Sequence, residues 1–540
     1  MGCAAALAFV VLARAAASQT AAVDSARFHA VDYAVRIDLP DSGATINGDA
    51  TLTLRHSRSR DTLVLDLIKL RVKSVSINGS KSRFTRTDST IRIIIPRSVA
   101  TVKVRVVYDG AVTDGLIVRH DSLGRWTYFG DNWPTRARYW IPSLDRPSEK
   151  ATITWTVTAP VGHTIVANGK EVEKRELPMA QKRRVLSRWR ETKPIAPYLM
   201  VIAAAPLIKV DLGETACGFA ELARCVPQAV YVEPEALNVV PLPGAFSRAG
   251  DIVQFYASLI APFPYEKLAH LQSETRFGGM ENATAIFYAD AFFRSGGAPE
   301  GIIAHETAHQ WFGDAVTEKL WSHVWLSEGF ATYFAALWTQ HAHGDSAFLS
   351  EMSRIRSQIL ADTVSVPRRP VIDTIETDVL SLLNVNSYQK GGFVLHMLRT
   401  ELGDSVFFAA LRDYYTAHKH GNALTDDLEV AFERRTGRSW RSFFDQWLRR
   451  PGYPEVSFSW TSSPQGVFAT VTQSKRFGYF DFTLPIVVID RAGARHVTRA
   501  SVSAQPMSFL KIGDAGTRVQ SVLVDPDVTV LMQNTTRPAK

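Results

Sequence analysis

The sequence predicts a multidomain α+β protein with an N-terminal β saddle or sandwich, a mainly helical domain and a C-terminal β-sandwich. Its 540 residues exceed what a single hydrophobic core usually organises, so several domains are expected. Hydrophobic residues alternate with polar ones near both ends of the chain, whereas helical patterns dominate from Pro299 to Leu448. The 46% hydrophobic and 21% charged residues are typical of a folded globular protein.

The first residues, 1–18, combine an apolar run with small residues and are typical of a secretory signal peptide cleaved near Ser18. No Lys or Arg precedes the apolar run, so an uncleaved anchor remains an alternative. We expect a secreted or periplasmic protein without a membrane span in its mature form, because no other stretch approaches eighteen apolar residues. In an oxidising compartment Cys217 and Cys225 can pair as a disulfide; two reduced thiols are the alternative.

The net charge of +8 is spread thinly and forms only small basic clusters, such as Lys182-Arg183-Arg184. Such clusters are typical of solvated surface, whereas nucleic-acid-binding domains gather Lys and Arg on one face. We therefore expect no nucleic-acid partner.

Residues 19–208 are predicted to form the N-terminal β domain. Apolar residues alternate with polar or small ones in several runs, which is typical of half-buried strands. Turn dipeptides separate the runs, at Asn47-Gly48, Asn78-Gly79 and Asp109-Gly110. Short strands at regular spacing favour a sandwich or an open saddle.

Residues 209–450 are predicted to form the second domain. A short strand and a helix come first, followed by paired glycines ahead of Met280-Glu281. Glycines allow a ligand to approach the backbone closely, although a tight turn is the alternative interpretation. Further helices follow, one of them beginning near Ser327. Residues 451–540 return to strand patterns after Pro451-Gly452 and suffice for one small β-sandwich.

Within the helical region, His305 and His309 are four residues apart and therefore lie on one face of a helix. Two imidazoles held in this way can share a metal ion, with Glu306 beside them as a base. Glu328 follows after a distance that lets a second antiparallel helix return a carboxylate to the pair. Two nitrogen ligands and one oxygen ligand leave Zn²⁺ a position for water, as in catalytic sites. An ordinary core helix with two histidines is the alternative.

Several longer motifs resemble those of the aminopeptidase N-like gluzincin metallopeptidases, in the right order and over almost the whole chain. They are ARYWIPSLDRPSEKAT, FGGMENAT, HETAHQWFGD, WLSEGFATY and YQKGGFVLHML. The resemblance implies a thermolysin-like catalytic domain and one zinc ion per chain bound by His305, His309 and Glu328. It implies Glu306 as the general base and Tyr388 as the hydroxyl donor to the tetrahedral oxyanion.

The same resemblance implies substrate contacts in the glycine-rich motif. Glu281 would pair with the free α-ammonium of a peptide, and the backbone of Gly278, Gly279 and Met280 would line the peptide as an added strand. Asn282 completes this substrate-binding motif. The implied reaction is zinc-dependent removal of the N-terminal residue from peptides by a metal-activated water. Alternatives are an epoxide hydrolase, a binding-only scaffold and an internally cleaving peptidase on the same fold.

The chain departs from the family pattern at three places. Relatives commonly carry Gln or Glu where this chain has Trp133, with Asp131 and Asn132 nearby, so that substrate contact differs. Ser327 stands where Asn often precedes the third ligand. The chain also stops after the small β domain, whereas many relatives add a large helical domain, which favours a more open site that admits longer peptides.

Overall fold

The computed structural model describes residues 28–536, except 57–60, 97–99, 179–182, 217–224 and 240–243. It divides into two compact units: the described residues up to Trp321 together with Tyr415–Leu424, and Ser322–Tyr414 together with the described residues from Thr425. The predicted signal peptide and Cys217 lie outside the described residues. The predicted domain limits at residues 18, 208 and 450 stay predictions.

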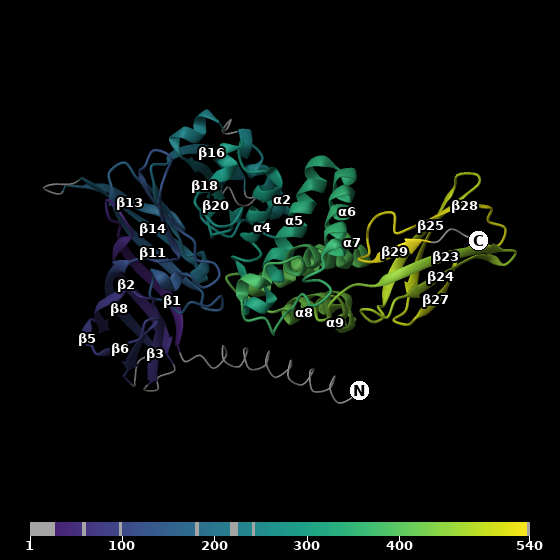
Figure 1. Ribbon diagram of the computed structural model, residues 1–540, viewed down its shortest axis with the longest axis horizontal. Coiled ribbons are helices and arrows are strands. Elements are labelled where there is room, and N and C mark those ends of the chain that lie inside the picture. The colour runs from purple at the N-terminus through teal and green to yellow at the C-terminus, as the bar shows by residue number, and fades with distance from the viewer. Residues whose placement is uncertain are drawn as a thin grey trace. The chain divides into compact units, whose positions relative to one another are not determined.

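The N-terminal part of the first unit is built on an eight-stranded sheet of order β13-β14-β11-β1-β2-β8-β4-β5. Figure 1 shows β1, β2 and β8 side by side, and Thr45 to Arg55 of β2 are paired along β8. The predicted alternation is real, because Tyr33, Val35 and Ile37 are buried while their neighbours along β1 are less so. The strands of this part are β1 (Phe28–Asp38), β2 (Thr45–His56), β3 (Asp61–Asp66), β4 (Arg71–Ile77), β5 (Ser80–Ser82), β6 (Phe84–Arg86), β7 (Thr90–Ile95), β8 (Thr101–Ala111), β9 (Leu116–His120), β10 (Trp126–Gly130), β11 (Ala151–Pro160), β12 (Thr164–Ala167), β13 (Lys170–Leu177), β14 (Arg184–Ile195) and β15 (Ile202–Ala205).

The rest of the first unit is a five-stranded sheet of order β16-β17-β18-β20-β19 with helices beside it. Its β19 pairs only with β20 among the described strands and therefore forms an edge. A parallel pairing of β21 with β22 returns residues 421–423 to this unit. The elements are β16 (Ile208–Ala216), β17 (Cys225–Val232), α2 (Ala249–Leu259), β18 (Leu268–Ser273), β19 (Gly279–Met280), β20 (Ala285–Ala289), α3 (Asp290–Arg294), α4 (Glu300–His309), β21 (Val316–Glu318) and β22 (Gly421–Ala423).

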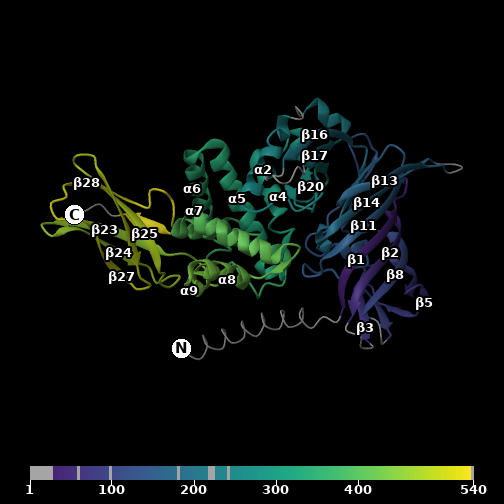
Figure 2. The same cartoon turned by 180° about the vertical axis from the view of Figure 1, so that it is seen from behind.

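The second unit begins with packed helices, seen from behind in Figure 2. Two backbones approach closely at Gly329 of α5 and Gly391 at the start of α7, where a methyl group on Gly329 would lie 2.9 Å from the Gly391 carbonyl carbon. Only glycine lets the two backbones come this close. The helices are α5 (Trp325–His343), α6 (Asp345–Ala361), the π-helical turn η7 (Asn386–Lys390), α7 (Gly391–His418), α8 (Thr425–Thr436) and α9 (Arg441–Leu448).

Short 3-10 turns connect many of these elements. They are η1 (Ala137–Tyr139), η2 (Pro197–Leu199), η3 (Pro234–Asn238), η4 (Gly244–Phe246), η5 (Trp321–His323) and η6 (Val379–Leu382).

The C-terminal part of the second unit is a sandwich of a four-stranded sheet, β27-β24-β23-β29, and a three-stranded sheet, β26-β25-β28. Side chains from both sheets form one core, including Phe458, Val471 and Ile486. The predicted fold class is therefore confirmed. No helix among the described residues is long and apolar enough to cross a membrane. The strands are β23 (Glu455–Ser463), β24 (Gly466–Gln473), β25 (Phe482–Asp490), β26 (Arg495–Val502), β27 (Met507–Gly513), β28 (Val519–Val524) and β29 (Gln533–Thr536).

Candidate active site

Helix α4 carries the two candidate histidine ligands and is packed into the first unit. Ile303, Ala304 and Ala308 are buried, and the Tyr256 hydroxyl of α2 donates to the Ala304 carbonyl at 3.1 Å. Just beyond the helix, the Trp311 indole donates to the Ala261 carbonyl at 2.8 Å. This packing fixes the helix that presents the histidines, as expected for apolar residues flanking the motif.

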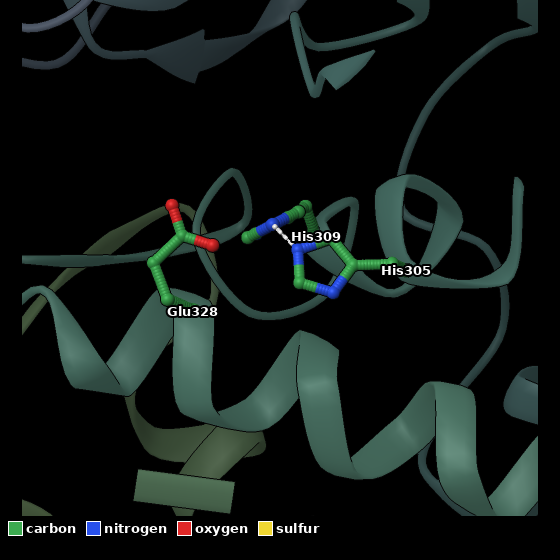
Figure 3. A group of neighbouring side chains, drawn as sticks. All are labelled: His305, His309 and Glu328. Atoms are coloured by element: carbon green, nitrogen blue, oxygen red, sulfur yellow. Dashed lines mark hydrogen bonds between the residues drawn. The ribbon is translucent and has the colours of Figure 1, made fainter. Parts of the chain in front are cut away.

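The two imidazoles converge on one point. Their Nε2 atoms are 3.1 Å apart, and Nδ1 of His309 lies 3.2 Å from the Phe312 carbonyl, which fixes the ring orientation. Two nitrogen ligands of a tetrahedral zinc ion, each about 2.05 Å from it, are about 3.3 Å apart. Donor atoms of His305, His309 and Glu328 all lie within 4.8 Å of one another, and Figure 3 shows the carboxylate directed toward the imidazoles. The donor set and its spacing fit a catalytic zinc ion.

Two carboxylates share the space beside His309. Atoms of Glu281, Glu306 and His309 lie within 4.8 Å of one another, and all three side chains are buried. The backbone of Gly279 lies against Glu306, because a methyl group built there would lie 2.6 Å from Glu306 Cγ and closer still to its carboxylate. The predicted base and the predicted amine anchor are therefore adjacent in the structure.

The glycine-rich motif lies at the sheet edge. Gly279 and Met280 form β19 and pair antiparallel with Tyr288 and Phe287, which leaves the other side of the strand without a paired strand among the described elements. An edge strand is what a peptide needs to bind as an added strand. Asn282 is fully buried, and its side-chain amide makes no hydrogen bond with any residue that the structure describes.

Tyr388 lies on the π-helical turn η7 in the second unit and is partly buried. Single π-helical turns recur at functional sites. The turn is followed directly by Gly391, whose contact with Gly329 of α5 brings η7 close to the helix that carries Glu328. Tyr388 on η7 and Glu328 on α5 therefore lie on neighbouring elements of the second unit.

An aromatic cluster surrounds Trp133, at or beside which the family resemblance implies a Gln or Glu. Trp133 is buried, and its ring lies edge-on to Phe277 at 5.9 Å and to Trp321 at 5.2 Å between centroids. Asn132 is fully buried, donates to the Met200 carbonyl at 2.6 Å and accepts from the Trp140 indole at 2.7 Å. Because both ends of the Asn132 amide hydrogen-bond within the protein, this side chain does not supply the substrate contact of the implied Gln or Glu.

Three polar residues near α4 were absent from the predicted site: Gln310 and Asp314, which are buried, and Lys150, which is partly buried. Gln310 follows His309 directly, and its amide contacts the Glu281 carbonyl at 2.9 Å and the Asp314 carboxylate at 2.8 Å. Burial, with the charge of Glu281 nearby, raises the pKa of Asp314 well above its usual value. Lys150 donates to the carbonyls of Asp314, Ala315 and Gly421 at 2.8–2.9 Å, and burial lowers its pKa to about 7. Gln310, Asp314 and Lys150 all stand inside the quoted motifs, which is the one signal that the sequence offers for them.

Solved structures with the same fold share this architecture. Legionella pneumophila aminopeptidase A in complex with aspartic acid has a TM-score of 0.81 at 18% identity, covering 95% of this chain and 60% of that one. The M1 zinc metallopeptidase of Deinococcus radiodurans has a TM-score of 0.65 at 23% identity, covering 76% of this chain and 91% of that one.

The sequences of curated relatives can be matched to most of this chain. Aminopeptidase N of Streptomyces lividans is 28% identical over 447 residues, which are 78% of this chain and 50% of the relative. Tricorn protease-interacting factor F2 of Thermoplasma acidophilum is 26% identical over 84% of this chain and 58% of its own length. The chain thus spans about half the length of these two relatives.

Two family models match the chain. The peptidase M1 N-terminal domain matches residues 29–199, and the peptidase family M1 domain matches residues 245–447. Together the two matches cover more than half of the chain and include every predicted site residue from Glu281 to Tyr388. The chain belongs to peptidase family M1.

Proposed function

We propose that this protein is a zinc-dependent aminopeptidase that removes the N-terminal residue from peptides. The observation that carries the proposal is the cluster of Glu281, Glu306 and His309, whose donor atoms lie within 4.8 Å of one another. In the proposed assignment, Glu281 binds the substrate amine, Glu306 transfers the proton, and both lie beside the metal ligand His309. A hydrolase that recognised only internal bonds would have no use for the first of these.

Each candidate site residue has its own role in the proposed reaction. A zinc ion held by His305, His309 and Glu328 would supply Lewis-acid activation of water and of the scissile carbonyl. Glu281 binds the substrate α-ammonium, because a buried carboxylate attracts a cation more strongly than it would in water. Glu306 accepts a proton from the attacking water and delivers it to the departing amine nitrogen.

Two further assignments rest on the motifs and on local structure. The backbone of β19 lies at a sheet edge and binds the peptide as an added strand. Tyr388 donates its hydroxyl to the oxyanion, a contribution typically of about 3 kcal/mol for one preorganised donor.

The substrates proposed are peptides with a free N-terminus. The curated relatives include aminopeptidase N and glutamyl aminopeptidase, so the activity proposed for this chain is one that related proteins carry. An epoxide hydrolase or a binding-only scaffold is disfavoured, because this chain retains a complete set of ligands, base and amine anchor. We further propose export from the cytoplasm, supported by the apolar composition of residues 1–18.

The proposal is tested with one peptide in two forms, with a free and with an acetylated N-terminus, incubated with zinc-loaded protein. Mass spectrometry of the products over time is expected to show loss of one N-terminal residue after another from the free peptide only. A chelator should abolish the reaction, and added zinc should restore it. Cleavage of both forms at the same internal bond would overturn the proposal.

A further inference from the structure

Gln310 connects the candidate metal helix to the segment that carries the amine anchor. Its side chain is fully buried and directly follows His309. The amide oxygen accepts from the Thr284 backbone N–H at 2.9 Å. The amide nitrogen donates to the Glu281 carbonyl at 2.9 Å and to the Asp314 carboxylate at 2.8 Å. One side chain thus holds both ends of residues 281–284.

Residues 281–284 are fixed by several further hydrogen bonds. Thr284 has a φ of +67°, an uncommon conformation for a residue other than glycine, and needs support from its surroundings. That support includes Lys267, which donates to the Thr284 carbonyl at 2.8 Å, and the Gly169 N–H, which donates to the Thr284 hydroxyl at 2.7 Å. Asn168 donates to the Ala283 carbonyl at 2.8 Å. A shift of Gln310 therefore moves the segment as a body or breaks its hydrogen bonds.

The distance between the amine anchor and the reacting groups decides which bond is cut. Standard bond lengths and angles place the nitrogen of an α-amino acid about 2.5 Å from its carbonyl carbon. An enzyme that holds this nitrogen on Glu281 and attacks this carbon beside Glu306 must keep the two carboxylates at a fixed spacing. Misplacement by about 1 Å commonly costs about 100-fold in rate.

We propose that Gln310 is a positioning residue that sets this spacing and so makes the enzyme select α-amino substrates. The inference rests on the proposed function, because it requires that Glu281 holds the substrate amine. Gln310 acts through the Glu281 carbonyl and the Thr284 N–H, and it touches neither the substrate nor the metal. Its hydrogen bonds tie the root of the Glu281 side chain to the helix that bears Glu306 and His309.

The test uses two isomeric substrates, L-alanyl and β-alanyl p-nitroanilide. The amine is on the carbon next to the carbonyl in the first and one carbon further away in the second, which also lacks the methyl side chain. Wild type is expected to favour the α form strongly. Gln310→Met removes every side-chain hydrogen bond at nearly unchanged volume. It is expected to lower kcat/KM about 100-fold on the α form and far less on the β form, so that the preference falls at least about tenfold. Gln310→Glu keeps the oxygen that accepts from Thr284 and loses the two hydrogen bonds donated to Glu281 and Asp314. It should also lower the α-to-β preference, and it replaces the Met variant if that variant does not fold.

Gln272→Met is the matched control. Gln272 is buried in the same unit, and its amide also joins a backbone N–H, that of Glu233 at 2.9 Å, to a carboxylate, that of Asp290 at 2.7 Å. The variant loses two hydrogen bonds of the same kinds, against three in Gln310→Met, without touching residues 281–284, so its α-to-β preference should equal that of wild type. Zinc content and Tm are measured for all variants.

An unchanged α-to-β preference in folded, zinc-loaded Gln310 variants would overturn the inference. An equal fall of the α-to-β preference in the Gln272→Met control would also overturn it, because that would indicate a general effect of lost stability. Failure of the proposed function is recognised separately, since wild type would then cleave N-acetylalanyl p-nitroanilide as fast as the free amine.

Discussion

Replacing Gly279 by Ala is expected to disable the enzyme while leaving its metal in place. The added methyl group would lie 2.6 Å from Glu306 Cγ and closer still to the carboxylate. Ordinary carbon contacts are about 3.5–4.0 Å, so Glu306 or strand β19 must move by about 1 Å or more. Gly279 is paired with Tyr288 across the sheet, so the Glu306 side chain is the part that gives way. A base displaced by about 1 Å is expected to lower kcat about 100-fold.

The assay is steady-state hydrolysis of a free-amine substrate by protein whose zinc content has been measured. Gly301→Ala is the matched control, since Gly301 is exposed on α4 and a methyl group there would meet no described residue outside its own helix within 4 Å. The control should retain activity within about threefold of wild type, because the added methyl group displaces nothing. Full activity in Gly279→Ala, or an equal loss in both variants, would refute the placement of Glu306 against β19.

Three further predictions concern the amine anchor Glu281, the partly buried Lys150 and the buried His270. Glu281→Gln should lower kcat/KM on free-amine substrates about 100-fold by removing the charge that pairs with the ammonium; unchanged kinetics would contradict that role. Lys150→Met should lower the free energy of unfolding by roughly 2–5 kcal/mol in urea titrations, because the carbonyls of Asp314, Ala315 and Gly421 lose their donor; a loss below about 1 kcal/mol would contradict it. Burial lowers the pKa of His270 to about 3. Between about pH 6 and 4 the unfolded chain therefore binds a proton at His270 that the folded protein does not bind. The free energy of unfolding consequently falls as the pH falls through this range. In His270→Gln the slope of unfolding free energy against pH should be shallower by about 1.4 kcal/mol per unit there, and an identical slope would show that His270 is not buried as a neutral ring.

The metal ligands were predictable because their arrangement follows from local geometry. A spacing of four residues puts His305 and His309 on one helical face in any α-helix, and α4 spans both of them. The onset of the next helix was less predictable: α5 begins at Trp325, two residues before Ser327, because the 3-10 turn η5 leads into it without a side-chain cap.

Other features depend on contacts between distant residues and leave no periodic signal. Gln310 reaches back to Glu281 and Thr284, and such hydrogen bonds cannot be read from residue type alone. In the C-terminal sandwich, β27 departs from the usual apolar alternation, because Phe509 is 77% exposed whereas Ser508 beside it is buried. Strand β29 has the polar sequence QNTT and is a strand only because it pairs with β23.

The central claim, that Glu306 is the base of a zinc aminopeptidase, is tested most directly by the Glu306→Gln variant. The substitution preserves size and leaves all three zinc ligands untouched, so zinc content and Tm should equal those of wild type. Turnover of a free-amine peptide by the zinc-loaded variant is expected to fall about a thousandfold or more, since the proton acceptor is gone and the ligands are not. Turnover within about tenfold of wild type in zinc-replete protein would contradict the account.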